Sequence, residues 1–459
     1  MINNLIHSIL VCPEVDREYP IISHGEGIYI YDIDGKKYID GTSGSAAVAN
    51  LGHSIEGISD IVKKQIDRVA VIPTHTFRTA ELESYLEKLI RFAPEGFTRA
   101  WTVLSGTEAV EQSLKLALQY HQLNNEPERY KIISRWGSYH GNSVFTLDVG
   151  GMKIRRGAYE QWLNNFPHTS PAYSYRRPEG VTEEDYGLQC AQELEMCILK
   201  NDPETIAAFI IEPVVGAALG AVPPPNGYMK EVRRICDKYG ILFIADEVLT
   251  GFGRIGANFG IERFGVTPDI IATGKGISAG FTPLSAIIAH EKVAQVFEKY
   301  KAAFLGGHTF ACNPVSAQVG SFVIDYIEEN GIVENAKVMG EYFLSELKKL
   351  EKYPIVGDTR GMGLLLGIEF VMCKETKKPF PKELNLNKLV VNGAFERGVV
   401  IYPGKGSVDG VNGDHVLLSP PLIINKEEID IMIRVLEATL IEVSEAVKSY
   451  SAVESVVAG

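Results

Sequence analysis

The chain has 459 residues, of which 45% are hydrophobic and 22% charged, and its net charge is -13. This composition is typical of a globular protein with two or three domains, and the acidic balance excludes a broad basic surface, so we expect no nucleic-acid partner. No apolar run approaches the ~18 residues of a membrane span, so we expect no membrane partner. The six cysteines form no CxxC pair, which argues against a disulfide framework or a zinc site and predicts a cytoplasmic protein.

The first predicted element is a hairpin at residues 28–41, where alternating apolar residues flank an Asp-Gly turn. A short strand at residues 100–104 and a helix at residues 107–121 follow, because the apolar residues of the second segment recur at helical spacing. Ser105 and Glu108 have the spacing of a capping box at the start of this helix.

The turn Ser105-Gly106-Thr107 joins this strand to this helix. Backbone N–H groups at a helix start point outward and the helix dipole favours an anion there. Gly106 permits close approach of a ligand, and the hydroxyls of Ser105 and Thr107 can add hydrogen bonds. The turn is therefore either a phosphate-binding site or an ordinary helix cap, and its residues alone do not choose between them.

An aromatic motif follows the next predicted strand, Lys131–Ser134. Here Tyr139 and His140 lie among glycines in the stretch Trp136–Gly141. An aromatic side chain at a strand end can stack on a flat ring, or it can be a core aromatic at a turn.

Three further buried strands are predicted at residues 206–211, 241–245 and 269–273, with helices such as 229–239 between them. Strands that alternate with helices predict an α/β fold with a mostly parallel sheet covered on both faces. Ligands of such sheets bind at the carboxyl ends of the strands. The polar residues that fall at these ends are Ser105, Glu212, Asp246 and Lys275.

Asp246 ends a buried strand, where an isolated carboxylate is costly and requires a cationic partner such as a protonated pyridine nitrogen. The same pattern resembles the Walker B strand of an ATPase, which also needs a G-x-x-x-x-G-K-[ST] loop. Asp269 and Gly276 stand where that loop requires glycine and Ser or Thr around Lys275. A second Gly-Lys pair further along fails because Val399 stands at its glycine position, so an ATPase is disfavoured.

Lys275 ends an apolar run and has a glycine on each side. Loss of water disfavours the ammonium form, so a lysine in this position can become a nucleophile. A neutral lysine amine forms Schiff bases with carbonyls, including the aldehyde of pyridoxal phosphate. An ordinary solvated loop lysine is the alternative that this segment leaves open.

Near residue 331 the alternation of strands and helices gives way to a long helix predicted at 335–353. A final helix is predicted at 426–448. We therefore predict three parts. Residues 1–60 form an N-terminal segment that packs with the small domain, 61–330 form a large domain, and 331–459 form the C-terminal small domain.

Six motifs occur along the chain in the order found in one enzyme family. They are Ser-Gly-Thr-Glu-Ala, Tyr-His-Gly, Ile-Glu-Pro, Asp-Glu-Val-x-x-Gly-Phe-Gly-Arg-x-Gly, Pro-Asp-Ile-x-x-x-Gly-Lys-Gly and His-Thr-Phe-x-x-Asn-Pro. From about Gly27 to Leu440 the chain resembles the class III, or omega, aminotransferases. The resemblance implies the fold type I α/β architecture, with a large domain that binds pyridoxal 5'-phosphate and a smaller α+β domain.

The resemblance also implies roles around the cofactor ring. It implies that Lys275 holds the cofactor as a Schiff base and moves the proton between substrate and cofactor. Asp246 binds the pyridinium nitrogen and so keeps the ring able to accept electrons. Val248 and Tyr139 pack on the two ring faces, and His140 belongs to the same cofactor site.

At the phosphate the resemblance implies binding by Ser105, Gly106 and Thr107. Thr309 is expected to reach the phosphate bound by the partner subunit, which makes a homodimer with shared active sites part of the prediction. Glu212 is expected on the substrate side of the cofactor, as a catalytic residue beside Lys275.

The chain departs from the family pattern where many relatives carry an arginine that pairs with the acid or grips a substrate carboxylate. Leu417 stands at that position, and Asn412 and Gly410 occupy the neighbourhood of a second arginine found in amine–pyruvate enzymes. The usual clamp for a 2-oxo acid is therefore missing. Glu212 loses its expected partner, so we predict an unassigned cation near it or a raised pKa.

Three residues are candidates to replace the missing arginine, namely Lys405, His415 and Arg78, although each is compatible with an ordinary surface or loop position. Lys405 can offer only a point charge, not a bidentate fork. Arg254 and Arg360 match family positions, and we expect structural roles for both.

The predicted function is transfer of an amino group from a primary amine or omega-amino acid to a 2-oxo acid such as pyruvate or 2-oxoglutarate. Ping-pong kinetics are expected because the amino group is held on the cofactor between half-reactions. The alternative is an amino-acid racemase, epimerase or aminomutase on the same scaffold, since the fold does not separate these reactions. A catalytically silent relative is disfavoured because Lys275, Asp246 and Thr309 are all retained.

Overall fold

The computed structural model describes residues 19–448 and 450. A 7-stranded sheet in the order β4-β10-β9-β8-β7-β5-β6 forms its centre. These strands are β4 Phe97–Val103, β5 Lys131–Arg135, β6 His168–Thr169, β7 Ile206–Ile211, β8 Leu242–Glu247, β9 Ile270–Thr273 and β10 Ser285–His290. The pairs from β9 to β6 are parallel, whereas β10 runs antiparallel to both β9 and β4.

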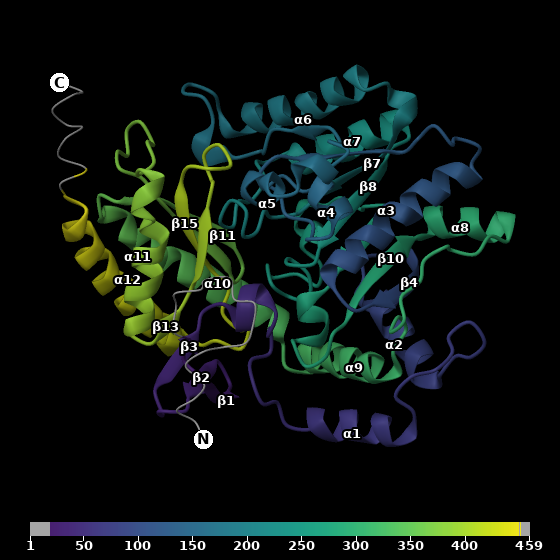
Figure 1. The fold of residues 1–459 in the computed structure, drawn as a ribbon, viewed down its shortest axis with the longest axis horizontal. Helices are drawn as coiled ribbons and strands as arrows, with labels where there is room; N and C mark the ends of the chain where they lie inside the picture. The colour runs from purple at the N-terminus through teal and green to yellow at the C-terminus, as the bar shows by residue number, and fades with distance from the viewer. Residues whose placement is uncertain (1–18, 449, 451–459) are drawn as a thin grey trace.

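Alternate residues of β7 enter two different cores. Phe209 and Ile211 belong to one hydrophobic cluster, and Ala208 and Ile210 to another. Side chains alternate across a strand, so both faces of this sheet are buried, as expected for parallel strands that read as continuous apolar runs. Helices α6 and α7 lie over one side of the sheet, and α3 contacts β7 to β10 (Figure 1).

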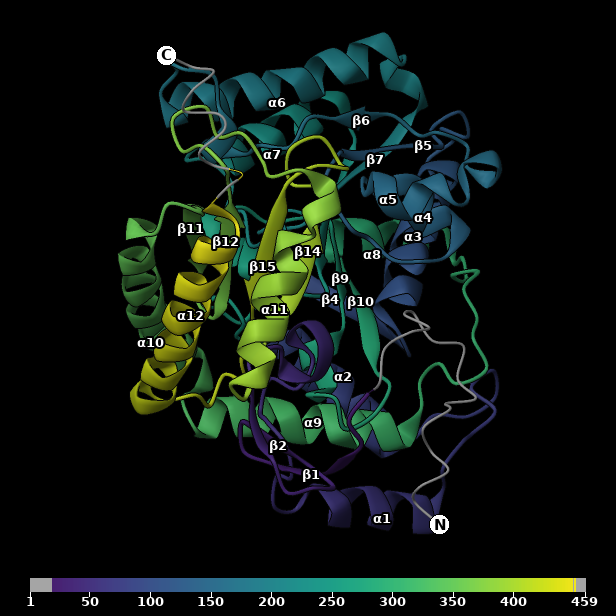
Figure 2. The ribbon, with the colours of Figure 1, turned by 60° about the vertical axis from the view of Figure 1, so that its left-hand side comes forward.

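The helices of the large part are α1 Ile58–Arg68, α2 Ala80–Phe92, α3 Gly106–Leu123, α4 Val144–Val149, α5 Lys153–Gly157, α6 Glu183–Lys200, α7 Tyr228–Tyr239, α8 Glu291–Tyr300 and α9 Pro314–Glu329. The C-terminal part contains α10 Ile332–Lys348, α11 Leu386–Glu396 and α12 Lys426–Ala446. Its 4-stranded antiparallel sheet has the order β11-β12-β15-β14, with β11 Val356–Met362, β12 Leu365–Phe370, β14 Tyr402–Lys405 and β15 Asp414–Leu418. Figure 2 shows α11 beside β14 and β15, and α12 next to α11.

A second 4-stranded sheet combines three strands near the N-terminus with one strand of the C-terminal part. The strands β1 Ile22–Glu26, β2 Tyr29–Asp32 and β3 Lys37–Asp40 are followed in this sheet by β13 Val399–Val400, which pairs with β3 in parallel. This pairing places the N-terminal hairpin against the C-terminal part. The three-part division of the chain stays a prediction, and its residues 1–18 and 451–459 lie outside the described structure.

Most predicted elements are present with small shifts of their ends. The predicted hairpin is the β2–β3 pair, and the strand at 206–211 has the predicted bounds. The helix predicted at 335–353 begins earlier, at Ile332, and gives way to a 3-10 turn at Lys349. The strand β10 was not predicted. Within the described part of the chain no helix is long and apolar enough to cross a membrane.

Candidate active site

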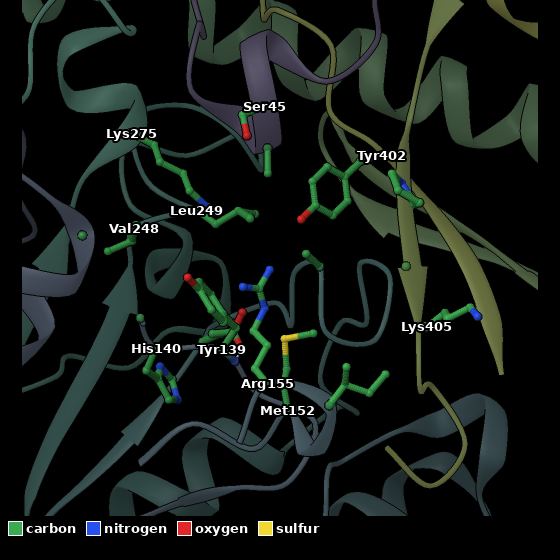
Figure 3. A pocket seen from close by; sticks show the side chains of 18 of the residues that line it. Ser45, Tyr139, His140, Met152, Arg155, Val248, Leu249, Lys275, Tyr402 and Lys405 are labelled. Atoms are coloured by element: carbon green, nitrogen blue, oxygen red, sulfur yellow. Dashed lines mark hydrogen bonds between the residues drawn. The ribbon is translucent and has the colours of Figure 1, made fainter. Parts of the chain in front are cut away.

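A cavity of about 760 Å³ opens at the carboxyl ends of the central strands, between them and β14. Glu212 follows β7, Asp246 lies near the end of β8, and Lys275 follows β9; all three line this cavity. Ligands of open α/β sheets bind at this edge. The structure thus brings together three of the four polar residues that sequence spacing placed at these strand ends. Figure 3 shows Lys275 among the side chains that line the cavity.

The backbone at Lys275 is tightly constrained. Lys275 has a φ of 47°, in the left-handed region, and begins a 3-10 turn that ends at Ser278. A Cβ on Gly274 would lie 2.6 Å from Ser285 Oγ, and one on Gly276 would clash with Asn50 Nδ2. Such a conformation persists only where the surroundings enforce it. The flanking glycines therefore let the strand end pack closely while the lysine side chain turns into the cavity.

The Lys275 amine is chemically unusual. Burial lowers its pKa from 10.5 to about 8, an effect that the charges of Asp246 and Glu212 partly oppose. The side chain is half-buried because it faces the cavity, and its amine has no hydrogen bond or ion pair with the described residues. A fraction of this amine is neutral near pH 7 and can act as a nucleophile.

Asp246 is only 4% exposed, and two neighbouring groups hold its carboxylate. Its Oδ2 lies 2.7 Å from His140 Nδ1, and its Oδ1 accepts a hydrogen bond from the Val248 N–H at 3.1 Å. The other ring nitrogen of His140, Nε2, is buried without a partner among the described residues. The histidine thus supplies one polar contact, and the carboxylate still borders the cavity, where a cationic group would complete its pairing.

Two backbone N–H groups, and no arginine, bind the carboxylate of Glu212 in the described part of the chain. Its Oε1 accepts from the Tyr139 N–H and its Oε2 from the Gly216 N–H, both at 3.0 Å. Arg135 donates to the backbone carbonyl of Glu212, not to its carboxylate. Burial raises the pKa of Glu212, with Asp246 adding to the effect. The raised pKa is the second of the two outcomes predicted from Leu417.

The start of α3 is capped by Ser105, and its first two residues border the cavity. Ser105 is exposed, does not line the cavity, and its hydroxyl accepts from the Glu108 N–H at 3.2 Å. Gly106 and Thr107 line the cavity, and the first N–H groups of a helix have no partner within it. A Cβ on Gly106 would lie 2.5 Å from Val248 Cγ1, so only glycine allows this packing.

Thr309 lies elsewhere. It is exposed, in a segment that includes the exposed Leu305 and Phe310, and it does not line the cavity of its own chain. A role at the cofactor phosphate therefore requires a second subunit, and this role stays a prediction.

The three candidates for the missing arginine differ in position. Lys405 lines the cavity, but its amine contacts Asn385 Oδ1. His415 is fully buried, bonds the Ala217 carbonyl, and burial lowers its pKa to about 4, so it is neutral at pH 7. Arg78 lines a separate cavity. None of the three presents a free guanidinium or imidazolium to the site.

Arg254 and Arg360 are buried in structural contacts and do not line the cavity. Arg360 pairs with Asp358 and bonds the carbonyls of Leu219 and Gly220, which connects β11 to the large part of the chain. Both residues thus occupy structural positions, as expected.

Arg155 of α5 and Tyr402 of β14 are among the cavity-lining residues that sequence reasoning missed. The Arg155 guanidinium stacks over the Tyr139 ring at 5.1 Å from its centroid. No motif or periodicity singles out Arg155 within Lys-Ile-Arg-Arg, or Tyr402 within Ile-Tyr-Pro. Only the fold places them at the site.

The cavity suits the predicted cofactor by its set of chemical groups. Pyridoxal 5'-phosphate needs a carboxylate for its ring nitrogen, an amine for its aldehyde and N–H donors for its phosphate. Asp246, Lys275 and the start of α3 at Gly106 and Thr107 offer these groups within one cavity. Tyr139 and Val248 add flat and branched apolar walls. The residues present therefore fit the group.

Comparison with known proteins agrees with this chemistry. The family model for class-III aminotransferases matches residues 12–440. The chain is similar to an uncharacterised aminotransferase of Schizosaccharomyces pombe, 41% identical and covering 92% of both chains. It is also similar to the chloroplastic gamma aminobutyrate transaminase 3 of Solanum lycopersicum, 34% identical over 91% of this chain and 80% of the relative. A solved (S)-enantioselective omega-transaminase from Thermomicrobium roseum superposes with a TM-score of 0.90 at 33% identity, covering 96% of this chain and 98% of that one.

Proposed function

Because the chain belongs to the class III aminotransferases, which depend on pyridoxal 5'-phosphate, we propose that it transfers an amino group from a primary amine or omega-amino acid to a 2-oxo acid. Pyruvate and 2-oxoglutarate are the acceptors proposed, and the two half-reactions follow ping-pong kinetics. One observation carries the proposal. An amine with a lowered pKa, Lys275, faces two buried carboxylates, Asp246 and Glu212, in one cavity.

When bound, the cofactor supplies an electron sink that stabilises negative charge on the substrate carbon. Lys275 would hold the cofactor aldehyde through Nζ, and its amine, once displaced by the substrate amine, would carry the proton to and from the substrate. Asp246 would keep the ring nitrogen protonated, and His140 holds Asp246 in place through its Nδ1 at 2.7 Å. Tyr139 and Val248, which line the cavity, would pack against the ring.

The phosphate is assigned to the N–H groups of Gly106 and Thr107, with Ser105 acting on the same turn through its cap. We further propose that the enzyme is a homodimer in which Thr309 reaches the phosphate of the partner's site. The exposed position of Thr309, away from the cavity of its own chain, supports this arrangement.

We propose that the amino donor is long or bulky, because small residues line part of the cavity. Ser45 and Ala46, from the small-residue stretch at 41–50, line the cavity. Since the tomato relative is named a gamma aminobutyrate transaminase, 4-aminobutanoate belongs in any donor screen. A screen in which only short amino acids react would contradict this part of the proposal.

The test is an absorption spectrum of the purified holoenzyme, recorded before and after each member of an amine panel. A visible band that bleaches with a donor and returns with pyruvate or 2-oxoglutarate is the expected result. If the band persists while a chiral amino acid racemises, or while its amino group migrates, the isomerase alternative replaces the transaminase. A protein that shows no band with added cofactor would remove the role of Lys275.

A further inference from the structure

The cavity contains one guanidinium without a counter-ion. Arg155 lines the cavity from α5, and its contact with the Tyr139 ring at 5.1 Å is cation–π stacking. Its guanidinium makes no hydrogen bond or ion pair with any residue that the structure describes. Arginine is the residue that recognises carboxylates bidentately. The Arg155 side chain is exposed, so its five N–H donors are available to an anionic ligand that enters the cavity.

The carboxylates of the cavity do not account for Arg155. The charges that act most on Glu212 are those of His140 and Asp246, and its oxygens already accept two backbone N–H groups. Asp246 is bound by His140 and the Val248 N–H. The positive charge of Arg155 is thus left for a group that enters the cavity from outside.

A second donor faces the same space. Figure 3 shows the Tyr402 ring reaching from β14 into the cavity, with its hydroxyl on the side toward the Arg155 guanidinium. The Tyr402 hydroxyl has no hydrogen bond within the described part of the chain. Lys275 enters the same cavity from the strand side. A substrate that reacts at Lys275 can therefore extend between the walls that carry Arg155 and Tyr402.

We propose that Arg155, with the Tyr402 hydroxyl, binds the substrate carboxylate and so replaces the arginine absent at Leu417. The inference rests on the proposed transaminase function and names its substrate class, which is amino and 2-oxo acids whose carboxylate is bound by α5 and β14. The guanidinium pairs with both carboxylate oxygens, and the tyrosine O–H donates to one of them. The stack on Tyr139 holds the guanidinium in place before the substrate arrives.

The first test uses carbon-matched donors with and without the carboxylate. These are 4-aminobutanoate and 5-aminopentanoate against butylamine and pentylamine, with pyruvate as acceptor and cofactor-loaded enzyme. Arg155→Met is expected to raise KM for the two amino acids and for pyruvate by roughly 10- to 100-fold, as for loss of a charged hydrogen bond. KM and kcat for the two amines, each measured at saturating pyruvate for that variant, are expected to stay within about twofold.

The conservative and control variants sharpen this result. Arg155→Lys keeps the charge but loses the fork, so it should recover part of the KM effect. Tyr402→Phe should show a smaller KM increase for the same acids. Lys153→Met removes a positive charge from the same short helix at an exposed residue that does not line the cavity. It is expected to behave as wild type with every substrate.

A binding measurement separates this inference from the proposed function. Calorimetric titration of the cofactor-loaded enzyme with pentanoate, which has no amine and cannot react, should show binding that Arg155→Met removes and Lys153→Met keeps. Equal losses with acids and amines in Arg155→Met would overturn the inference and leave Arg155 as a support for Tyr139. Pentanoate binding lost only in Arg155→Met, in an enzyme that fails to transaminate, would reject the transaminase and retain the carboxylate site.

Discussion

At the scale of single residues, the chemistry of the site comes from environment more than from residue type. Lys275 carries an ordinary amine, but burial lowers its pKa to about 8. Glu212 carries an ordinary carboxyl, but burial raises its pKa. The two shifts have one cause, because removal of water disfavours the charged form of either group. Each shift favours the neutral form of its group, and for Lys275 the neutral amine is the form that accepts a proton.

A first prediction concerns pH and the attachment of the cofactor to the apoenzyme. Only the neutral amine of Lys275 attacks an aldehyde, and its neutral fraction grows as pH rises toward the pKa of about 8. The attachment rate should therefore rise about tenfold per pH unit below pH 8 and level off above it. Stopped-flow absorbance after adding pyridoxal 5'-phosphate measures this rate. A rate that continued to climb toward pH 10 would mean that Lys275 keeps an ordinary pKa.

A second prediction concerns Asp246→Asn, which keeps the shape of the side chain but removes its charge. Without the carboxylate the ring nitrogen of the cofactor loses its proton, so the substrate carbon loses its electron sink. The rate of the donor half-reaction should fall by roughly 10²- to 10³-fold, as for other charge-stabilising groups. The visible band of the bound cofactor should persist, since Lys275 is unchanged. Full activity with retained cofactor would exclude the role given to Asp246.

At the scale of elements, one buried arginine joins three segments of the chain. The Arg254 guanidinium donates to the carbonyls of Leu364 and Pro420 and to the side chains of Ser43 and Asn50. Arg254 is fully buried, and this burial lowers its pKa to about 9. It thus ties the turn after β8 to the N-terminal stretch beside the cavity and to the loops of the C-terminal part.

A third prediction follows for Arg254→Lys. One ammonium cannot reach all four acceptors, so buried carbonyls and side chains lose their partners. The free energy of unfolding should fall by about 2–4 kcal/mol, measured as a shift in the urea midpoint. Arg263→Lys, at an exposed residue of the same region with one long bond to the Gly256 carbonyl, is the matched control. Equal midpoints for the two variants would show that Arg254 does not join these segments.

At the scale of the whole molecule, Thr309 is a predicted site residue that does not line the cavity of its own chain. Thr309 lies in an exposed segment with Leu305, which is 80% exposed, and Phe310, which is 53% exposed. Single exposed apolar residues are ordinary, but two large ones in one segment are expected at the contact surface of the proposed homodimer. A symmetric dimer that buries this segment would bring Thr309 of one subunit to the phosphate of the other.

A fourth prediction tests this sharing by mixing two impaired variants. Lys275→Ala should be inactive, and Thr309→Ala should bind the cofactor weakly. Each mixed dimer then contains one site with both Lys275 and Thr309, so refolded mixtures should exceed the summed activity of the separate variants. The mixed sites also give a cofactor-binding readout by absorbance. Activity that never exceeds this sum would place Thr309 in the site of its own subunit, or in none.

The sequence by itself determined the architecture and the chemical identity of the site. Local signals sufficed for β7, because a buried parallel strand reads as one continuous apolar run, and for α3, because a cap and a helical period mark its start. They also placed Glu212, Asp246 and Lys275 at strand ends, where parallel topology makes them converge. The antiparallel strand β10 gave no signal of its direction, since strand pairing depends on partners distant in sequence.

Only the tertiary structure decided how the departures from the family pattern are met. The amides of Tyr139 and Gly216 serve Glu212, which no local pattern predicts because the donors belong to different loops. Arg155 and Tyr402 line one cavity although they lie far apart in the chain. Their placement around one cavity depends on how the segments that carry α5 and β14 are arranged in the fold, and such an arrangement leaves no periodicity in the sequence. Residue type and spacing thus predicted the chemistry of the cofactor site, whereas the carboxylate site we propose could be found only in the fold.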